Sequence, residues 1–484
     1  MLLFDLRPIF MIIGLATTTL GVAMLLPAFV DLYFDNPDWI VFVTSSMFTI
    51  FVGVAMWASA RAPTVRFSLR QAFLLTALTW VVLSAFAALP LAFGEIGLSL
   101  DQAFFEAMSG LTTTGATVMT NLDGAPPGIL IWRSIMQWIG GVGIIGIAIA
   151  VLPALQIGGM QLFRTESAER SDKAFPRAGQ TAGWILGIYV MLTLACALAY
   201  SLAGMGTFDA IAHGMTTIAT GGFSTKNASI GHFDSAAIEL VCIGFMILGS
   251  LPFLLYFRAV RGNWRALIDD PQVRLFLAII LLFWLIGFTN AALTGIAEGA
   301  EGLRLTLFNT VTLLSTSGFA AVDYTYWGAF NDMILFLLCF LGGCTGSTAG
   351  GLKMLRLHVV WAALTQHSKR IAYPSSVFPM RYGTQPLGDD VASAVLSFFF
   401  VYFAGFFAVA MAFDILGTTE VSALSASVAL FGNIGPGLGP EIGPAGNYSS
   451  FTSPELWLAY FAMLLGRLEL FTVLVLFHPR FWRG

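Results

Sequence analysis

Long apolar segments, separated by short polar connections, dominate the pattern of hydrophobic and polar positions along the chain. Ten of these segments reach the ~20 residues that an α-helix needs to cross the hydrocarbon core of a bilayer. They cover approximately residues 9–30, 39–60, 71–93, 129–155, 181–204, 236–257, 273–296, 332–357, 391–416 and 456–478. The first runs past the length of a signal-peptide core without a small-residue cleavage site, so we interpret it as a retained span. The pattern predicts an all-α membrane protein.

The composition agrees with this prediction, because the chain has too few charges for a water-facing surface. Of its 484 residues only 10% are charged and 57% are hydrophobic, whereas a soluble domain carries charges at roughly a quarter of its positions. The five histidines show no HExxH spacing, and the four cysteines lie in apolar segments without a CxxC pair. We therefore expect neither a disulfide framework nor a cofactor in this chain.

The Lys and Arg residues lie almost entirely on one side of the ten-span arrangement. Nineteen of the 23 fall in the terminal segments or in connections on that side, so the positive-inside rule places both termini in the cytoplasm. The opposite connections carry acids with almost no bases, a distribution that attracts cations. The four exceptions are Arg133, Lys226, Arg304 and Arg467.

Four of the outer connections share a second pattern. Each begins with an apolar stretch of about fifteen residues, too short to cross a bilayer, and then enters a turn rich in Gly, Thr and Ser. Aligned without gaps, the turns place four tripeptides in register: Thr113-Thr114-Gly115, Thr220-Gly221-Gly222, Thr316-Ser317-Gly318 and Asn433-Ile434-Gly435. The register glycines are 107, 96 and 117 residues apart. This spacing indicates a fourfold internal repeat.

A small-residue pair follows each turn at a similar distance and supports the repeat. The pairs are Gly140-Gly141, Gly249-Ser250, Gly342-Gly343 and Gly466-Arg467. Each repeat is then a span, a half-crossing pore helix, a turn and a second span, with an additional two-helix hairpin in front. The predicted units are residues 1–68 for the hairpin, then 69–156, 157–260, 261–370 and 371–484 for the four repeats.

The turns have the chemistry of a cation filter. A pore helix of about twelve residues is ~18 Å long and ends inside the membrane, where irregular backbone survives only in protein or beside a watery cavity. Four such turns are most simply accommodated around one pseudo-fourfold pore. The carbonyl ends of the helices favour a cation, and backbone carbonyls are suitable ligands for a dehydrated monovalent ion since the turns carry no carboxylate. Glycine at the register position allows φ > 0.

The last span of the third repeat contains a glycine-rich interruption. Five glycines between residues 342 and 351 make a poor helix interior. One interpretation is a close-packed helix crossing built from small residues. The other is a flexible loop just below the filter, with Lys353 at its cytoplasmic end. The residues of such a loop are Gly346, Ser347, Thr348, Ala349, Gly350 and Lys353.

Arg467 is the only base deep within a predicted span. A charge at that depth costs a few kcal/mol, so the side chain should face the pore or a partner and not lipid. Candidate partners in a structural pairing are Glu469 and exposed loop carbonyls. In the alternative interpretation the guanidinium faces the pore.

Together these motifs resemble the TrkH/TrkG/TrkI branch of the Trk/Ktr/HKT potassium-transporter superfamily over essentially the entire chain. The matching strings are TTTGAT, TIATGGFST, STSGFAAV, GNIGPGLG, GGCTGSTAGGLKMLR and LLGRLEL. The resemblance implies that K⁺ is the transported ion, bound by carbonyls of the four register tripeptides. Gly115 matches the potassium-selective members, while the turn at Asn433 is the most divergent. The resemblance also implies that the third-repeat loop and Arg467 form an intramembrane gate.

The same resemblance implies partners and a location. It predicts a homodimer with one pore per subunit in the bacterial inner membrane. It also implies a cytosolic regulatory ring, TrkA, with nucleotide-binding domains that dock on the basic inner face. The chain itself shows no nucleotide site, and we expect no nucleic-acid partner.

The sequence therefore predicts the potassium-translocating subunit of a Trk-type uptake system. An intramembrane enzyme would need a nucleophile and base or a metal cluster in the spans, and the sequence shows neither. The alternative is a secondary transporter that couples K⁺ or Na⁺ to H⁺ or Na⁺. Such proteins usually place a carboxylate near the membrane midplane, whereas these turns have none.

Overall fold

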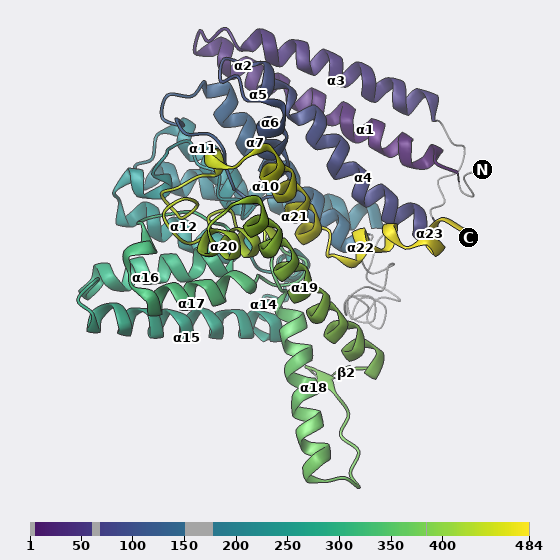
Figure 1. The fold of residues 1–484 in the computed structure, drawn as a ribbon, viewed down its shortest axis with the longest axis vertical. Coiled ribbons are helices and arrows are strands. Elements are labelled where there is room, and N and C mark those ends of the chain that lie inside the picture. Colours follow the sequence, from purple (N-terminus) through teal and green to yellow (C-terminus); the bar gives the residue numbers. More distant parts are fainter. Residues whose placement is uncertain (1–4, 61–67, 151–177, 384, 484) are drawn as a thin grey trace.

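A computed structural model describes residues 5–60, 68–150, 178–383 and 385–483, and its described part is almost entirely helical (Figure 1). Two strands of two residues each, β1 (Arg381–Tyr382) and β2 (Gln385–Pro386), form one antiparallel pair. The predicted all-α fold is confirmed. The basic segments predicted at 61–66 and 164–177, and the end of the predicted span 129–155, lie outside the described residues.

The N-terminal hairpin packs by close contact between helix backbones. It consists of α1 (Arg7–Ala23), α2 (Leu25–Tyr33) and α3 (Trp39–Ser59). A Cβ atom on Gly14 would lie only 2.7 Å from the Gly53 carbonyl oxygen, and the Ser46 hydroxyl donates to the Gly21 carbonyl at 2.7 Å. Small residues allow this approach in a membrane, where packing and interhelical hydrogen bonds drive association.

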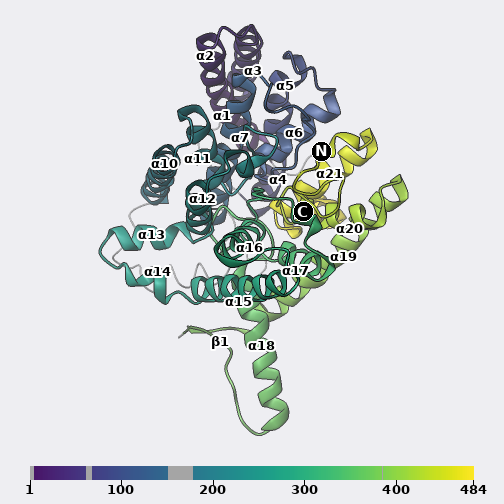
Figure 2. The ribbon, with the colours of Figure 1, turned by 90° about the vertical axis from the view of Figure 1, so that its left-hand side faces the viewer.

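The remaining helices include four of 12 to 16 residues, one in each of the four predicted repeats. The short helices α6 (Leu100–Leu111), α11 (Thr207–Ile218), α16 (Gly299–Leu314) and α20 (Glu420–Phe431) surround the middle of the bundle (Figure 2). The longer or flanking helices are α4 (Leu69–Ala87), α5 (Leu89–Phe93) and α7 (Pro127–Ala150); α10 (Ala178–Leu202), α12 (Ala236–Gly249), α13 (Phe253–Val260) and α14 (Arg265–Asp269); α15 (Pro271–Leu293), α17 (Ala329–Phe340) and α18 (Met354–Ala372); and α19 (Asp389–Leu416), α21 (Ser453–Arg467), α22 (Phe471–Leu474) and α23 (Pro479–Arg483).

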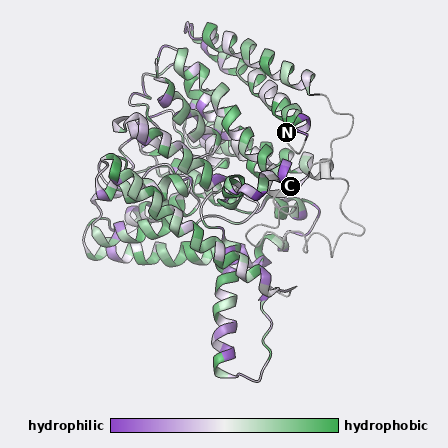
Figure 3. Ribbon diagram, turned by 45° about the vertical axis from the view of Figure 1, so that its right-hand side comes forward, coloured by the Kyte–Doolittle hydropathy of each residue, from purple (hydrophilic) through white to green (hydrophobic). Residues whose placement is uncertain are grey.

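Seven helical segments among the described residues are long and apolar enough to cross a membrane, and hydrophobic residues predominate along the helices of the bundle (Figure 3). The predictions of uninterrupted spans over 236–257 and 456–478 are wrong. Helices α12 and α13 meet at 92°, and α21 and the segment after it meet at 108°. Pro252 explains the first bend because proline cannot continue the helical hydrogen bonding. At the second bend, Glu469 and Leu470 adopt positive φ values of 59° and 29°.

The predicted break in the third repeat is confirmed and is wider than a kink. Helix α17 ends at Phe340, residues 341–353 are not helical, and α18 then projects away from the bundle (Figure 1). The interpretation of residues 342–351 as a close-packed helix crossing is therefore wrong. Five glycines in ten residues favour irregular backbone over helix at this point.

Three of the four bases that break the positive-inside pattern have acidic partners. Arg133 pairs with Glu106 at 2.7 Å, Arg304 with Glu239 at 2.8 Å and Lys226 with Asp209 at 3.9 Å. The first pair is fully enclosed, with both side chains no more than 1% exposed. These bases are therefore compensated locally, and the exceptions are consistent with the predicted topology.

A second buried ion pair holds the two broken segments together. The Arg356 guanidinium at the start of α18 pairs with the Glu469 carboxylate at the bend after α21. The guanidinium also lies over the Phe398 ring, 3.7 Å from its centroid. Removing one partner of such a pair leaves a buried charge uncompensated, which is far more costly than losing a surface pair.

We expect Glu469→Gln to lower the free energy of unfolding by about 3 kcal/mol or more, because it removes the buried countercharge of Arg356. Thermal unfolding of the detergent-solubilised protein measures the effect as a lower melting temperature. Asp269→Asn is the matched control, since it breaks the Arg274–Asp269 pair, whose side chains are 62% and 63% exposed. Equal melting temperatures for the two variants would contradict this role of Glu469.

Candidate functional site

The four pore helices α6, α11, α16 and α20 end in turns with the same backbone geometry. The first residue of each register tripeptide has a left-handed φ between 49° and 55°, although three of the four are β-branched threonines. The register glycines have φ values of 85°, 79°, 72° and 101°. The hydrogen bonds that close the turns are Thr114 N to Ser109 O, Gly221 N to Thr216 O, Ser317 N to Thr312 O and Ile434 N to Ala429 O, at 2.8 to 2.9 Å.

These turns meet one another in a closed ring. At each register glycine, the position of a Cβ atom is occupied by a carbonyl oxygen from the next turn. The pairs are Gly115 with Gly221 O, Gly222 with Ser317 O, Gly318 with Ile434 O and Gly435 with Thr114 O. Each of these carbonyls belongs to the residue directly before a register glycine. The ring is closed because the Thr114 carbonyl of the first turn meets Gly435 of the fourth. Any side chain larger than hydrogen at these glycines would displace a neighbouring carbonyl.

The helix dipoles add a common electrostatic direction. Each pore helix carries an acid in its first turn and no base in its last turn; the acids are Asp101, Asp209, Glu301 and Glu420. Acids stabilise the positive N-terminal ends of helices, while the partial negative charges at the C-terminal ends have no cationic side chain against them in the last turn. The inner ends of the four helices therefore favour a cation at the ring.

The fourth turn, which diverges most in sequence, has the same geometry as the others. Its Asn433 amide donates to the Thr114 hydroxyl at 2.9 Å and to the Met463 carbonyl at 3.0 Å. Behind it, the Tyr448 hydroxyl donates to the Gly435 carbonyl at 2.9 Å. Asn433 thus links the fourth turn to the first, a role that its departure from the Thr pattern did not suggest.

A cavity of about 70 Å³ lies on the side of the ring where the chain leaves the turns. All four register glycines line it, together with the residues that follow them, such as Thr117 and Ser224. Arg133 and Lys226 also reach this cavity, but each is paired with an acid. The cavity is the outer approach to the ring in the predicted topology.

The third-repeat loop lies against the opposite side of the ring. The Thr348 hydroxyl donates to the Ile218 and Gly249 carbonyls at 2.9 and 3.0 Å and accepts a hydrogen bond from the Thr220 hydroxyl at 3.1 Å. The Gly350 N–H donates to the Thr316 hydroxyl at 2.6 Å. The loop is therefore hydrogen-bonded directly to the second and third turns.

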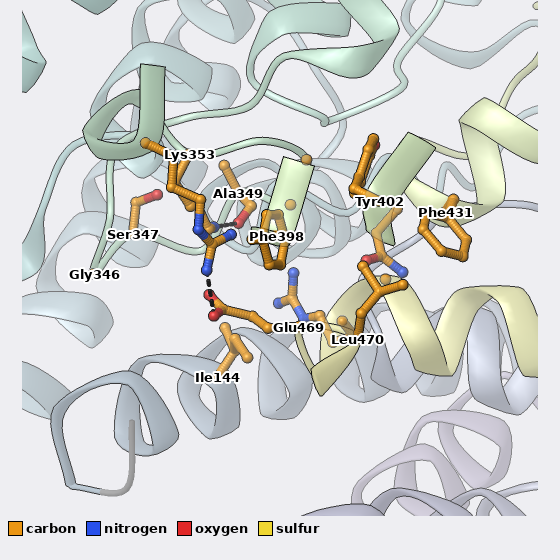
Figure 4. A pocket seen from close by; sticks show the side chains of 16 residues that line it. Ile144, Gly346, Ser347, Ala349, Lys353, Phe398, Tyr402, Phe431, Glu469 and Leu470 are labelled. Atoms are coloured by element: carbon orange, nitrogen blue, oxygen red, sulfur yellow. Dashed lines mark hydrogen bonds and ion pairs between the residues drawn. The ribbon is translucent and has the colours of Figure 1, made fainter. Parts of the chain in front are cut away.

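Six of the seven predicted gate residues line one small cavity next to the loop. It has a volume of about 30 Å³, enough for one or two waters, and its lining includes Lys353, Ala349, Phe431 and Glu469 (Figure 4). Its lining also includes Gly346, Ser347, Gly350, Asn433 and Arg467. The Thr348 hydroxyl instead contacts the Gly249 carbonyl, away from this cavity. The Lys353 ammonium donates to the Ala349 carbonyl.

Arg467 lies in this cavity without an acidic partner among the described residues. Its side chain is only 3% exposed, and Nη1 donates to the Thr348 carbonyl at 3.0 Å. Within the described part of the chain, Nε and Nη2 have no hydrogen-bond partner. The suggested pair with Glu469 is wrong, because that carboxylate pairs with Arg356, whereas the suggested contact with a loop carbonyl is confirmed at Thr348. The guanidinium therefore places a positive charge beside the loop, in a cavity that Asn433 of the fourth turn also lines.

Sequence reasoning missed one cluster beside the ring. The Glu106 carboxylate of α6 accepts from the Val118 N–H and the Thr117 hydroxyl, while Arg133 of α7 donates to Glu106 and to the Ser224 carbonyl at 2.9 Å. The cluster thereby joins the chain leaving the first turn to the chain leaving the second. A buried acid at mid-helix and a base that breaks the charge pattern were the available signals.

The comparisons with known proteins agree with this geometry. Residues 40–483 match the TrkH family, described as a cation transport protein. The chain is 40% identical to the Trk system potassium uptake protein TrkI of Halomonas elongata, over 98% of this chain and 97% of that protein. It is 32% identical to TrkG of Escherichia coli K12, over 96% of each chain.

A solved structure supports the same relationship. The crystal structure of the potassium transporter TrkH from Vibrio parahaemolyticus superposes with a TM-score of 0.91 at 36% identity, covering 99% of this chain and 100% of that one. The fold and the ring define a multi-pass membrane protein of the cation-transport class. The chain belongs to the TrkH family.

We expect Thr348→Val to loosen the loop, because it removes one hydroxyl that serves three hydrogen-bond partners. A loss of about 1 to 2 kcal/mol would raise the open population roughly 5- to 30-fold. Maleimide labelling of Cys344, a fully buried loop residue, measures this opening when peptide mass spectrometry locates the label.

Ser347→Ala is the control, since among the described residues the Ser347 hydroxyl bonds only to the Cys344 carbonyl within the loop. Cys196, Cys242 and Cys339 report any global unfolding. A Cys344 labelling rate in Thr348→Val equal to that of the control would show that Thr348 does not hold the loop.

Proposed function

We propose that this chain is the potassium-translocating transmembrane subunit of a Trk-type K⁺ uptake system. The observation that carries the proposal is the closed ring of four glycine turns, in which carbonyl oxygens of all four repeats converge. The names of the similar proteins support K⁺ as the transported ion. The residues that we assign to the selectivity filter are Thr113, Thr114, Gly115, Thr220, Gly221, Gly222, Thr316, Ser317, Gly318, Asn433, Ile434 and Gly435.

The physical basis is replacement of the hydration shell by carbonyl dipoles. A K⁺ ion entering the ring exchanges water for backbone oxygens, and helix C-termini favour its charge from below. The ring offers hydroxyls, one amide and carbonyls but no carboxylate, so binding stays weak enough for the ion to leave. The chain acts in this proposal by conduction and not by catalysis.

The loop and Arg467 are assigned to the gate. The assigned residues are Gly346, Ser347, Thr348, Ala349, Gly350, Lys353 and Arg467. Hydrogen bonds from Thr348 and Gly350 hold the loop against the turns. In this proposal its backbone closes the inner exit of the ring. Conduction requires this segment to move, and its glycines allow alternative backbone conformations.

The assembly extends the proposal beyond one chain. We assign it to the bacterial inner membrane as a homodimer, with both termini cytoplasmic and one pore per subunit. A cytosolic nucleotide-binding ring of the TrkA type would dock on the basic inner face, to which the predicted topology assigns α18 and its Lys369 and Arg370. Movement of α18 would reach the loop directly, because the loop leads into this helix.

Flux through purified protein in liposomes tests both the function and the filter. The wild type should carry K⁺ faster than Na⁺ without needing a proton gradient. Gly115→Ser should lower the K⁺/Na⁺ flux ratio about tenfold or more, because a side chain at residue 115 meets the Gly221 carbonyl. Gly244→Ser is the control, since a Cβ atom there meets nothing within 4 Å. Absence of K⁺ flux in the wild type would contradict the function, and an unchanged ratio in Gly115→Ser would remove Gly115 from the filter.

We expect Arg467→Ala to raise K⁺ flux and Arg467→Lys to stay closer to the wild type. At an effective dielectric near 20, two unit charges ~8 Å apart repel by about 2 kcal/mol, which corresponds to more than a tenfold change in rate. The measurement is single-channel or liposome flux at equal protein density. Unchanged flux in well-folded Arg467→Ala would assign the arginine a structural role only.

A further inference from the structure

Helix α7 presents two polar side chains to the second filter turn. Arg133 and Gln137 are four residues apart and so lie on one face of the helix. Gln137 is fully buried; its Nε2 donates to the Gly221 carbonyl at 2.6 Å and its Oε1 accepts from the Phe223 N–H at 3.1 Å. The side-chain amide therefore bridges Gly221 and Phe223, the residues on either side of the register glycine Gly222.

This amide has no counterpart in the other three repeats. Gln137 lies three residues before the small pair Gly140-Gly141, and the same register position holds Met246, Cys339 and Met463 in the repeats that follow. Those three side chains are also buried, but none offers an N–H donor. An amide at this register position therefore occurs in the first repeat and not in the other three.

The four turns also differ in the hydrogen bonding of their ring oxygens. Four carbonyls face the register glycines of neighbouring turns, those of Thr114, Gly221, Ser317 and Ile434. Among the hydrogen bonds of the described residues, only the Gly221 carbonyl accepts one from a side chain. This oxygen is therefore fixed in position, and it shares its lone pairs between the amide and any ion in the ring.

We propose that Gln137 is a positioning residue for ion selectivity, which prevents the Gly221 carbonyl from moving inward around a smaller ion. The inference rests on the proposed function. Na⁺ gains more than K⁺ from carbonyls that approach closely, so a carbonyl that is restrained and partly engaged disfavours Na⁺. Loss of the amide frees the oxygen to follow the smaller ion. Selectivity then falls even though no filter residue has changed.

The test compares Gln137→Met with Thr193→Val in proteoliposomes. Methionine is the residue found at the same register position in two other repeats and retains side-chain length without the donor. Thr193→Val removes a buried hydrogen bond from the neighbouring Trp138, at 3.1 Å, away from the filter. The readouts are the K⁺/Na⁺ flux ratio, the absolute K⁺ flux and the melting temperature.

The expected result for Gln137→Met is a K⁺/Na⁺ flux ratio lowered about fivefold, the equivalent of one hydrogen bond. The ratio for Thr193→Val should stay at the wild-type value even if its melting temperature falls equally. If Gln137→Met does not fold, Gln137→Leu takes its place. Leucine also fills the buried position without offering a donor to Gly221, so it should lower the ratio as well.

A wild-type ratio in folded Gln137→Met or Gln137→Leu would overturn the inference while leaving the proposed function intact. An equal fall of the ratio in Thr193→Val would also overturn it, because the effect would then follow from general loosening. Failure of the wild type to carry K⁺ would instead be a failure of the proposed function.

Discussion

The contact between each register glycine and a carbonyl of the next turn is the constraint on which the rest of the site depends. It requires a positive φ at the glycine and a left-handed residue two positions earlier, and both recur four times. Backbone of this kind is costly in a threonine and persists only when its surroundings enforce it. The pore helices, their first-turn acids and the buried clusters behind the turns supply that enforcement.

The charges of the protein are arranged around this ring in two different ways. On the outer approach, Arg133 and Lys226 are paired with acids and so contribute little net charge. Below the ring, Arg467 has no acid within ion-pair distance among the described residues, and the Glu469 carboxylate is taken by Arg356. A cation therefore meets paired charges on the outer approach and an unpaired positive charge below the ring. We expect this distribution if the main barrier to conduction lies at the loop.

Much of this architecture could be predicted from the sequence, because it depends on the period of the repeat, the length of the apolar segments and the positions of the glycines. The four turns aligned without gaps, and hydropathy located the seven long apolar helices among the described residues. The bends at Pro252 and Glu469 were missed since hydropathy continues smoothly across them. The roles of Asn433, Gln137 and Glu106 were also missed, because they depend on contacts between repeats. An alignment of the repeats does not show which side chains of one repeat contact another repeat.

The central claim is that carbonyls of all four repeats bind one dehydrated cation, and a crystal of the protein soaked in Tl⁺ or Rb⁺ tests it most directly. The account predicts an anomalous-scattering peak on the axis of the ring, within coordination distance of oxygens from the turns at Gly115, Gly222, Gly318 and Gly435. A peak displaced to a side-chain site, or coordinated by one repeat alone, would contradict it.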